Sequence, residues 1–289
     1  MRRTLSLGIS PCPNDTYIFA GLITGRVATG AFFLNTSLLD IQELNEQALE
    51  AAFDLVKISI AVYPRIMGTY RLLGAGAALG RGCGPLLLSA RPLAPASLRS
   101  ARLAVPGTLT TANLLLQKTG LHQGELLVMR YDLIMEAIRA GQVDAGVIIH
   151  EGRFTYPEYG LIKVLDLGQW WEDETGLPIP LGGIAMRRSL GTAAADWAEG
   201  AIRTSLDFAD RHIDALRPYI RRHAQEMDES TITAHIRTFV NAYTRDLGTE
   251  GRRAIRELLG ISEADLDEAP RTPPRDSMGD GMVGRARQA

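Results

Sequence analysis

Short apolar runs alternate with amphipathic stretches along the first two thirds of the chain. Apolar runs of roughly four to eight residues predict buried strands, and longer amphipathic stretches predict helices. The expected strands are residues 4–9, 32–38, 54–59, 85–88, 102–105, 125–130, 145–149, 160–167 and 183–186. The expected helices include residues 16–24, 40–51, 63–70, 113–117 and 133–140. This alternation of strand and helix is typical of an α/β fold.

The last third of the chain has a different pattern. Residues 192–259 follow a helical period throughout, with breaks near Arg211, Glu229 and Gly248. Consecutive helices without strands between them are expected to pack as a group on an existing sheet.

Two segments of the chain repeat one plan. LNEQALEAAFDLVKIS, from Leu44, and LIMEAIRAGQVDAGVIIHE, from Leu133, each read as a helix, a short turn, an aspartate and an apolar strand. Asp54 corresponds to Asp144, but too few identities are present for a tandem repeat. The match predicts two similar α/β lobes that present their strand ends, 57–59 and 150–151, to a shared ligand cleft.

The order of the elements suggests where the lobes begin and end. Residues 1–90 and 183–268 are expected to form a discontinuous first lobe that includes the C-terminal helices, and residues 91–182 the second lobe. The chain is expected to cross into the second lobe at strand 85–88, after a turn in the Gly-rich stretch 74–84. It is expected to return to the first lobe through an irregular segment, residues 170–181. Residues 269–289 are rich in Pro, Gly, Arg and Asp, so they are expected to be disordered.

Two turns between a strand and a helix are candidate anion sites. The first runs from Ser10 to Asp15, where Asn14 or Asp15 can cap a helix starting at Thr16. The second is residues 106–112, where Thr110 or Thr111 can cap the next helix. Helix N-termini attract anions, although stiff prolines and ordinary threonine caps explain the same residues. Their occurrence in both halves favours ligand binding and makes Ser10 and Asn14 candidate contacts.

The segment from Val143 to Tyr159 carries the strongest candidate for chemistry. An apolar run ends abruptly on His150 and Glu151, so the histidine is expected at a strand tip, where α/β sheets bind ligands. Such a histidine is suited to move protons near neutral pH, or it is a core histidine bonded to backbone groups. Glu151 either orients His150 or faces solvent. The other four histidines lie among charged residues and are expected to be solvated.

Composition excludes several classes of function. The chain has 289 residues, 46% apolar and 22% charged, and its net charge of −2 gives no reason to expect nucleic acid or an anionic membrane as a partner. The N-terminal apolar segment is too short for a signal peptide, so the protein is expected in the cytoplasm with Cys12 and Cys83 outside any disulfide. No metal-ligand spacing, GxSxG or GxGxxG motif is present, so no metal, covalent serine or nicotinamide chemistry is expected.

Several segments together carry a resemblance to a known family. They are SPCPNDTYIF from Ser10, ALGRGCGPLL from Ala78, AVPGTLTTANLLL from Ala104, IIHEGRFTYPEYGL from Ile148, WWEDETGLPIPLG from Trp170, and the shorter HAQEM and VNAY. In these segments the chain resembles the 1,4-dihydroxy-6-naphthoate synthases of the futalosine route to menaquinone.

The resemblance implies a fold, a reaction and a set of residues. The fold would be a two-lobed, type II periplasmic-binding-protein-like α/β fold with its ligand cleft between the lobes. The reaction would convert cyclic dehypoxanthine futalosine to 1,4-dihydroxy-6-naphthoate and dihydroxyacetone without a cofactor, which makes the enzyme a carbon–carbon lyase. His150 would be the proton acceptor. Substrate contacts would come from Val56, Lys57, Ile58, Thr111 and Ala112, with Val56 contacting through its backbone.

Two other functions fit parts of the same pattern. A non-catalytic cytoplasmic protein that binds or senses a small carboxylate would share the fold, although a histidine at the strand tip favours chemistry. Chorismate dehydratase, from the same pathway, would also share it, although the SPCPND and HEGRFTY segments match the naphthoate synthases better. The sequence carries no signal for an oligomeric state, and Cys12 is expected to have a packing role.

Overall fold

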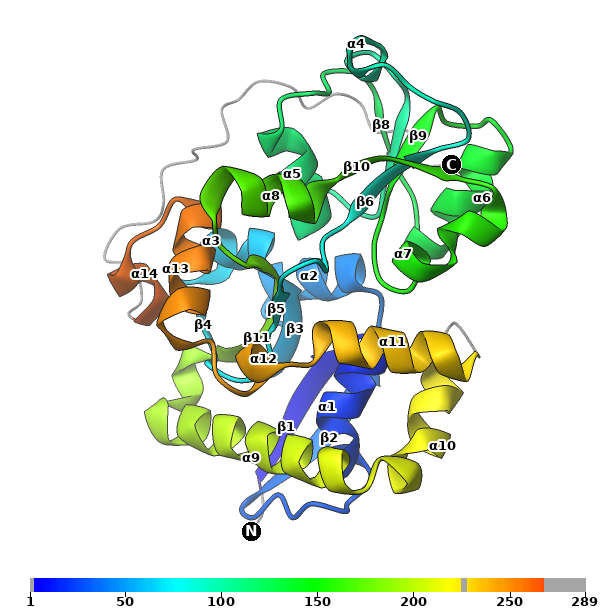
Figure 1. Ribbon diagram of the computed structural model, residues 1–289. Helices are drawn as coiled ribbons and strands as arrows, with labels where there is room; N and C mark the ends of the chain where they lie inside the picture. Colours follow the sequence, from blue (N-terminus) through cyan, green and yellow to red (C-terminus); the bar gives the residue numbers. More distant parts are fainter. Residues whose placement is uncertain (1–2, 225–227, 268–289) are drawn as a thin grey trace. The chain divides into compact units, whose positions relative to one another are not determined.

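The computed structural model describes residues 3–224 and 228–267, and this part of the chain divides into two compact units. Unit one comprises residues 3–80 and 180–267, and unit two comprises residues 81–179. Within the described residues, the chain therefore leaves unit one once and returns to it once (Figure 1).

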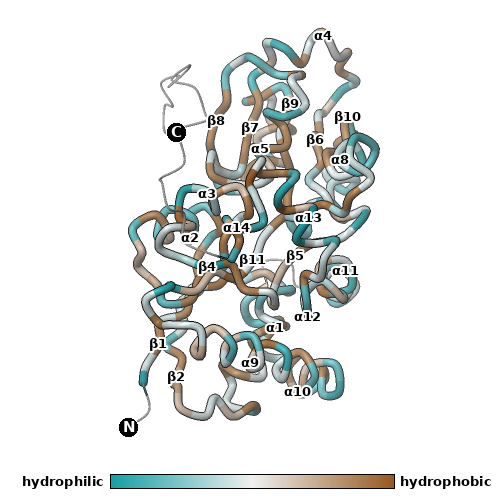
Figure 2. The backbone as a smooth tube through the Cα atoms, turned by 90° about the vertical axis from the view of Figure 1, so that its left-hand side faces the viewer, coloured by the Kyte–Doolittle hydropathy of each residue, from teal (hydrophilic) through white to brown (hydrophobic). Residues whose placement is uncertain are grey.

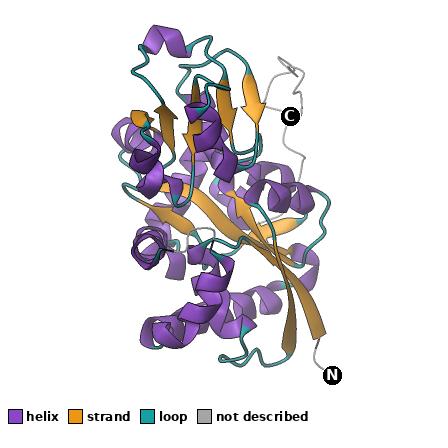
Figure 3. Cartoon of the chain, turned by 90° about the vertical axis from the view of Figure 1, so that its right-hand side faces the viewer, coloured by secondary structure: helices purple, strands orange, loops and turns teal. Residues whose placement is uncertain are grey.

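Unit one is built on a mixed sheet. Its strands, in order across the sheet, are β2 (Phe32–Leu38), β1 (Arg3–Ile9), β3 (Leu55–Ser59), β11 (Ile179–Arg187) and β4 (Tyr70–Leu72), and β5 (Ala78–Gly80) pairs with β11. β1 runs parallel to β2 and β3, whereas β11 runs antiparallel to β3. Every residue of β3 is buried, because helices lie on both sides of this sheet (Figure 3).

Unit two has a second mixed sheet. Its strands, in order, are β10 (Ile162–Asp166), β6 (Leu86–Ser89), β9 (Ala145–Ile148), β7 (Leu103–Val105) and β8 (Leu126–Val128). β7 runs parallel to β8 and β9, and β6 runs antiparallel to β9. The strands β7, β8 and β9 are coloured as largely apolar in Figure 2, as expected for the interior of an α/β layer.

The two sheets share one topology. The order β2-β1-β3-β11 in unit one matches β8-β7-β9-β6 in unit two, with the same parallel and antiparallel pairings. The predicted likeness between the segment around Asp54 and the segment around Asp144 therefore reflects equivalent α2-β3 and α6-β9 units.

Asp54 and Asp144 have the same local role. The Asp54 carboxylate accepts a hydrogen bond from Ser6 N at 2.9 Å, and its own N–H donates to the Ser6 carbonyl at 3.1 Å. The Asp144 carboxylate accepts from Arg102 N at 2.8 Å, and its N–H donates to the Arg102 carbonyl at 2.9 Å. Each aspartate thus joins the start of a strand to the neighbouring parallel strand and stabilises the register between them.

Helices cover both sheets. In unit one they are α1 (Pro13–Ile23), α2 (Ile41–Leu49), η1 (Ile60–Val62), α3 (Tyr63–Ile66), η4 (Arg188–Leu190), α9 (Thr192–Arg211), α10 (Ile213–His223), α11 (Glu229–Phe239), α12 (Ala242–Arg245), α13 (Gly248–Leu259) and α14 (Glu263–Asp267). In unit two they are α4 (Pro95–Leu98), α5 (Thr111–Lys118), η2 (Tyr131–Leu133), α6 (Ile134–Arg139), α7 (Gly152–Thr155), η3 (Tyr156–Tyr159) and α8 (Leu167–Thr175).

The C-terminal helices pack on unit one, as predicted. α9, α10 and α11 all contact α1. Ile18 and Phe19 of α1 share one hydrophobic core with Ile202 and Leu206 of α9, and each of these side chains is at most 1% exposed. The helical breaks also fall where the sequence predicted them, because α9 ends at Arg211, α11 begins at Glu229 and α13 begins at Gly248.

The chain crosses between the units earlier than residue 90. β6 pairs with β9 and β10, so residues 86–89 belong to the sheet of unit two rather than to the first lobe. The return also comes earlier than residue 183, because β11 begins at Ile179. Residues 269–289, expected to be disordered, lie outside the described residues.

Three local predictions were wrong. The helix expected over residues 63–70 stops at Ile66, because Tyr70–Leu72 pairs with β11 as an edge strand. The turn expected over residues 74–84 contains β5, which also pairs with β11. The irregular return expected over residues 170–181 contains most of α8, whose N-terminus is capped by the Asp166 carboxylate and whose C-terminus is Gly176 at φ +69°.

Candidate functional site

The first candidate turn opens α1, but with a different cap. The helix begins at Pro13, and Cys12 is its N-cap without a side-chain hydrogen bond. Proline is favoured at the first helical position, since its φ is preset and its missing N–H has no partner there. The prediction that Asn14 or Asp15 caps a helix starting at Thr16 was therefore wrong. Both residues lie within the first turn and are buried.

Asp15 organises this turn. Its carboxylate accepts hydrogen bonds from Ser10 Oγ at 2.7 Å, Ser10 N at 3.2 Å and Asn14 Nδ2 at 2.9 Å. It also accepts from Lys57 Nζ at 2.6 Å, while the Asp15 side chain is 0% exposed and the Lys57 side chain is 6% exposed. A buried carboxylate needs this set of donors, because desolvation penalises an ion without partners. The Asp15 carboxylate therefore joins three of the predicted substrate contacts, which are Ser10, Asn14 and Lys57. Asp15 itself was not among the predicted contacts.

Lys57 lies on one face of β3, and its two neighbours lie on the other. Side chains alternate along a strand, so Val56 and Ile58 point away from the face that carries Lys57. Both are 0% exposed. In unit one, the Val56 and Ile58 side chains therefore serve the core, and only their backbone groups could contact a ligand on the Lys57 face.

A glycine on the next strand makes room for Lys57. A Cβ placed on Gly182 of β11 would lie 3.0 Å from Lys57 Cε and 2.9 Å from the Ile58 carbonyl oxygen. Asn45 of α2 fixes the end of the same strand, because it donates to Ser59 Oγ at 3.0 Å and accepts from Ser59 N at 2.8 Å. Sequence reasoning missed both residues, since their roles depend on contacts across the sheet.

The second candidate turn opens α5 as predicted. Thr110 is the N-cap, and its Oγ accepts from Asn113 N at 3.2 Å and donates to the Gly107 carbonyl at 2.8 Å. Thr111 and Ala112 form the first helical residues and are 2% and 3% exposed. Asn113 donates through Nδ2 to the Thr108 carbonyl at 3.0 Å, while its buried Oδ1 has no hydrogen-bond partner among the described residues. The turn thus combines a helix N-terminus with a buried acceptor that a ligand hydroxyl could satisfy.

His150 follows β9 in a backbone conformation that histidine rarely adopts. Its φ is +57°, in the left-handed region that favours glycine. Tyr131 supports the imidazole edge-on, with the ring centroids 4.8 Å apart and the planes at 72°. Non-glycine residues at positive φ are associated with functional sites, where surrounding contacts hold the strain. The conformation turns the chain sharply at the carboxyl end of the strand.

The residues after His150 hold this turn in place. Glu151 is 7% exposed, so its side chain does not face solvent in unit two. A Cβ on Gly152 would lie 2.4 Å from Ile148 Cγ2, and so only glycine fits where α7 begins. Arg153 donates to the Gly84 carbonyl and lies 3.6 Å from the Asp166 carboxylate. These contacts tie the turn to the start of β6 and the end of β10.

Each unit brings its own candidate residues to one edge of its sheet. In unit one, α1 follows β1, and Lys57 lies in the neighbouring parallel strand β3. In unit two, α5 follows β7, and His150 follows the neighbouring parallel strand β9. Carboxyl ends of adjacent parallel strands lie at one edge, where α/β proteins bind ligands.

Three other residues with reactive side chains, His235, Cys12 and Cys83, are buried. His235, expected to be solvated, is 0% exposed and packs on Phe239 with ring centroids 4.6 Å apart. Cys12 and Cys83 are buried outside any disulfide, and burial raises the pKa of the Cys83 thiol to about 12. Within residues 3–224 and 228–267, no cluster of His, Cys, Asp or Glu could hold a metal ion, and no helix is long and apolar enough to cross a membrane.

Comparison with known proteins gives the family. A family described as menaquinone biosynthesis matches residues 5–264. A protein of Thermus thermophilus named 1,4-dihydroxy-6-naphthoate synthase is 46% identical over 271 residues, which cover 93% of this chain and 98% of that protein. A protein of Streptomyces coelicolor with the same name is 46% identical over 267 residues, covering 91% of this chain and 94% of that protein.

Two solved structures are also similar to this chain. A crystal structure of a protein from Archaeoglobus fulgidus is 34% identical, with a TM-score of 0.84, and the match covers 90% of this chain and 97% of that one. The alkanesulfonate-binding protein SsuA of Xanthomonas axonopodis has a TM-score of 0.67 at 16% identity, with 94% of each chain covered. The latter likeness shows a two-lobed periplasmic-binding-protein-like fold, as the family resemblance implied. The chain belongs to the menaquinone biosynthesis family whose model spans residues 5–264.

Proposed function

We propose that this protein is a 1,4-dihydroxy-6-naphthoate synthase of menaquinone biosynthesis. It would act as a cytoplasmic carbon–carbon lyase that converts cyclic dehypoxanthine futalosine to 1,4-dihydroxy-6-naphthoate and dihydroxyacetone. Relatives with this synthase name share 46% of residues over more than nine tenths of the chain. The structural observation that carries the proposal is His150, held at a φ of +57° two residues after the end of β9.

His150 is the general base of the proposed reaction. Its neutral imidazole removes a proton from the sugar-derived part of the substrate, and cleavage of the C–C and C–O bonds follows. Aromatisation of the ring drives the reaction forward. A positioned base typically accelerates such a step by about 100- to 10,000-fold. The Tyr131 ring, whose centroid lies 4.8 Å from that of the imidazole, restricts the rotation of the imidazole, which favours catalysis by holding the base in position.

Each unit offers its own candidate group for holding the substrate. The carboxylate on the substrate ring needs hydrogen-bond donors. The two candidates are Lys57 and the N-terminus of α5. Lys57 is already paired with Asp15, so it would act as a hydrogen-bond donor in a neutral pair rather than as an isolated positive charge. At the start of α5 the Thr111 hydroxyl is a further candidate donor, whereas the buried Asn113 Oδ1 is an acceptor suited to a substrate hydroxyl. This assignment of donors requires neither a cofactor nor a metal.

The test is single-turnover conversion of cyclic dehypoxanthine futalosine by the wild-type protein and by His150→Asn. Asparagine tolerates positive φ, and so this variant removes the base without forcing the turn to change. The wild type should form the naphthoate. The variant should bind substrate with similar affinity but react about 100- to 10,000-fold more slowly.

Other results would support different functions. Equal rates for the two proteins would remove His150 from the chemistry. Binding without turnover by the wild type would favour a non-catalytic binding protein or sensor on the same fold. Neither binding nor turnover would reject the substrate, and chorismate would be the next compound to test.

A further inference from the structure

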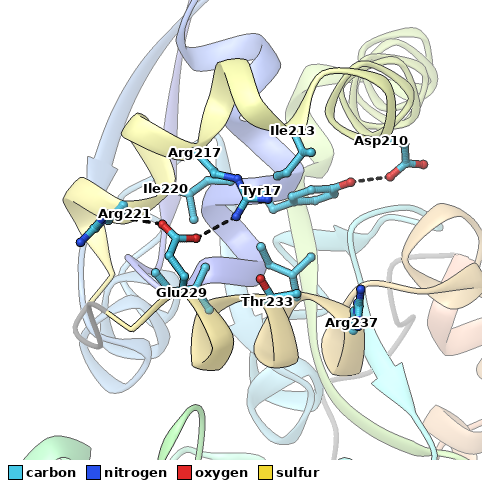
Figure 4. Close-up of a pocket in the computed structure, with 11 residues that line it drawn as sticks. Tyr17, Asp210, Ile213, Arg217, Ile220, Arg221, Glu229, Thr233 and Arg237 are labelled. Carbon is cyan, nitrogen blue, oxygen red and sulfur yellow. Dashed lines mark hydrogen bonds and ion pairs between the residues drawn. The ribbon is translucent and has the colours of Figure 1, made fainter.

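Unit one contains a pocket away from all the candidate residues above. Its volume is about 420 Å³, within the usual range for small-molecule sites. It lies among α1, α10 and α11 and the end of α9 (Figure 4). Among the residues that line it, Tyr17 alone comes from α1, and none of the predicted substrate contacts takes part.

The floor of the pocket is apolar. Ile213, Ile220, Ile232 and Ile236 line it together with the Tyr17 ring. Ile220 is 1% exposed and Ile232 is 4% exposed, whereas Ile213 and Ile236 are only partly buried. A ligand with an apolar body would cover the two partly buried side chains and gain free energy in proportion to the apolar area removed from water.

The acidic residues at the rim are already engaged. Glu229 pairs with Arg217 at 2.7 Å and with Arg221 at 3.7 Å. Asp210 accepts from the Tyr17 hydroxyl at 2.5 Å and pairs with Arg245. Burial and this hydrogen bond raise the pKa of Tyr17 well above its usual value, so the hydroxyl remains a donor to Asp210. Because these contacts partly neutralise the charges of Glu229 and Asp210, the two carboxylates repel an incoming anion less strongly than unpaired carboxylates would.

Thr233 and Arg237 also line the pocket, but their side chains are not engaged in the way that the acidic residues are. They lie one turn apart on α11, and Figure 4 shows both on the side of this helix that faces the pocket. No ion pair or side-chain hydrogen bond joins either residue to another within the described part of the chain. A guanidinium and a hydroxyl at this spacing can hold one carboxylate, the guanidinium through a paired fork of N–H donors.

We propose that this pocket, named here the isoleucine pocket after its floor, is a second binding site for a small amphipathic carboxylate. Its anionic head is held by Arg237 and Thr233, and its apolar body lies on Ile213, Ile220, Ile232 and Ile236. The proposal goes beyond the proposed reaction and does not depend on it. Because Tyr17 is two residues from Asp15 on α1, the ligand contacts the same helix that carries the buried Asp15–Lys57 pair.

Octanoate is a suitable probe, with 1-octanol as its uncharged counterpart. The full-length protein is labelled with ¹³C at the isoleucine δ-methyl groups, and each methyl signal is assigned by single Ile→Val variants. Octanoate should shift the methyl signals of the pocket isoleucines with saturation below about 1 mM. The methyl signals of Ile58 and Ile148, which belong to the candidate substrate-binding regions, should not move.

Variants test the anionic head. Arg237→Gln should weaken octanoate binding about tenfold or more, because a charge-assisted contact is lost, and should leave octanol binding unchanged. Thr233→Ala is a second variant with a smaller loss. Arg253→Gln is the matched control, since Arg253 is an exposed arginine on α13 outside the pocket. The proposal is overturned if octanoate moves no pocket methyl signal, or if Arg237→Gln binds it as tightly as the wild type.

Discussion

Lys57 Nζ lies 2.6 Å from Asp15 Oδ1, and both side chains are almost completely buried. The pair joins β3 to the first turn of α1 across 42 residues of sequence. Ser10 and Asn14 donate to the same carboxylate. The first turn of α1 is therefore ordered by a charge pair, and the positions of three candidate substrate contacts depend on one aspartate.

Breaking this pair should destabilise unit one strongly. Asp15→Asn leaves the buried Lys57 ammonium without its counter-ion, and such changes cost about 3–5 kcal/mol. Lys57→Met should cost a similar amount, and the double variant should lose less than the sum of the two single losses. Urea denaturation measures all three. The matched control is Arg139→Gln, which breaks an exposed pair with Glu136 and should not move the denaturation midpoint. Additive losses would mean that the two residues act independently.

The left-handed turn at His150 makes a separate prediction about stability. The φ of +57° suits glycine or asparagine and is unfavourable for β-branched residues. His150→Gly and His150→Asn should be about as stable as the wild type, whereas His150→Val should lose about 1–2 kcal/mol relative to His150→Asn. All three variants lack the imidazole, so all three should react about 100- to 10,000-fold more slowly than the wild type. If His150→Val were as stable as His150→Asn by urea denaturation, the turn would not be left-handed in solution.

The repeated α/β plan could be predicted because its signals are local. Asp54 and Asp144 each precede an apolar run, and the structure gives both the same contacts to a parallel neighbour, through Ser6 N and Arg102 N. The threonine cap of α5 was also predictable, since a cap needs only residues within one turn. These local signals located the equivalent helix–strand units and the cap, but they did not give the order of the strands in either sheet.

The roles that were missed depend on partners far away in the sequence. Asp15 looked like a helix cap, but its role is set by Lys57 in a strand that is 42 residues away. The helix predicted over residues 63–70 ends early, and Tyr70 begins a strand instead, because β11, more than one hundred residues later, supplies its partner. His235 lies among charged residues in sequence, yet helix packing buries it against Phe239. Tertiary contacts decided all three, and a local pattern carries no information about them.

Arg153 should act as a positioning residue for the proposed reaction. Its guanidinium connects the turn after His150 to Gly84 and Asp166, and the side chain is only 14% exposed. Arg153→Gln should loosen this turn, so we expect faster amide hydrogen exchange at residues 150–155 and single-turnover rates lower by about tenfold or more. Substrate affinity should change much less.

The exchange measurement does not depend on which reaction is catalysed. Arg139→Gln, on the neighbouring helix α6, is again the matched control, because its contact with Glu136 is exposed and does not reach the turn. Unchanged exchange in Arg153→Gln would show that the turn is held by Gly152 and Tyr131 without help from the guanidinium.

Cys83 should make stability depend on pH in the alkaline range. Burial disfavours the thiolate and raises the pKa of this group from 9.0 to about 12. The unfolded chain therefore loses the proton first as pH rises. The stabilisation that results from the neutral thiol is complete below about pH 9 and is lost progressively towards about pH 12. The loss can reach about 1.4 kcal/mol per pH unit.

The variant that isolates this effect is Cys83→Ala, which cannot ionise at this position. Its free energy of unfolding, measured in urea from pH 8 upwards, should fall less steeply than that of the wild type, whatever constant amount the lost sulfur costs. Buried tyrosines such as Tyr63 and Tyr70, whose pKa values are also raised by burial, contribute equally to both proteins and cancel in the comparison. Parallel pH profiles for the two proteins would mean that the Cys83 thiol ionises as readily in the folded chain as in the unfolded one, and hence that the loop before β6 admits water.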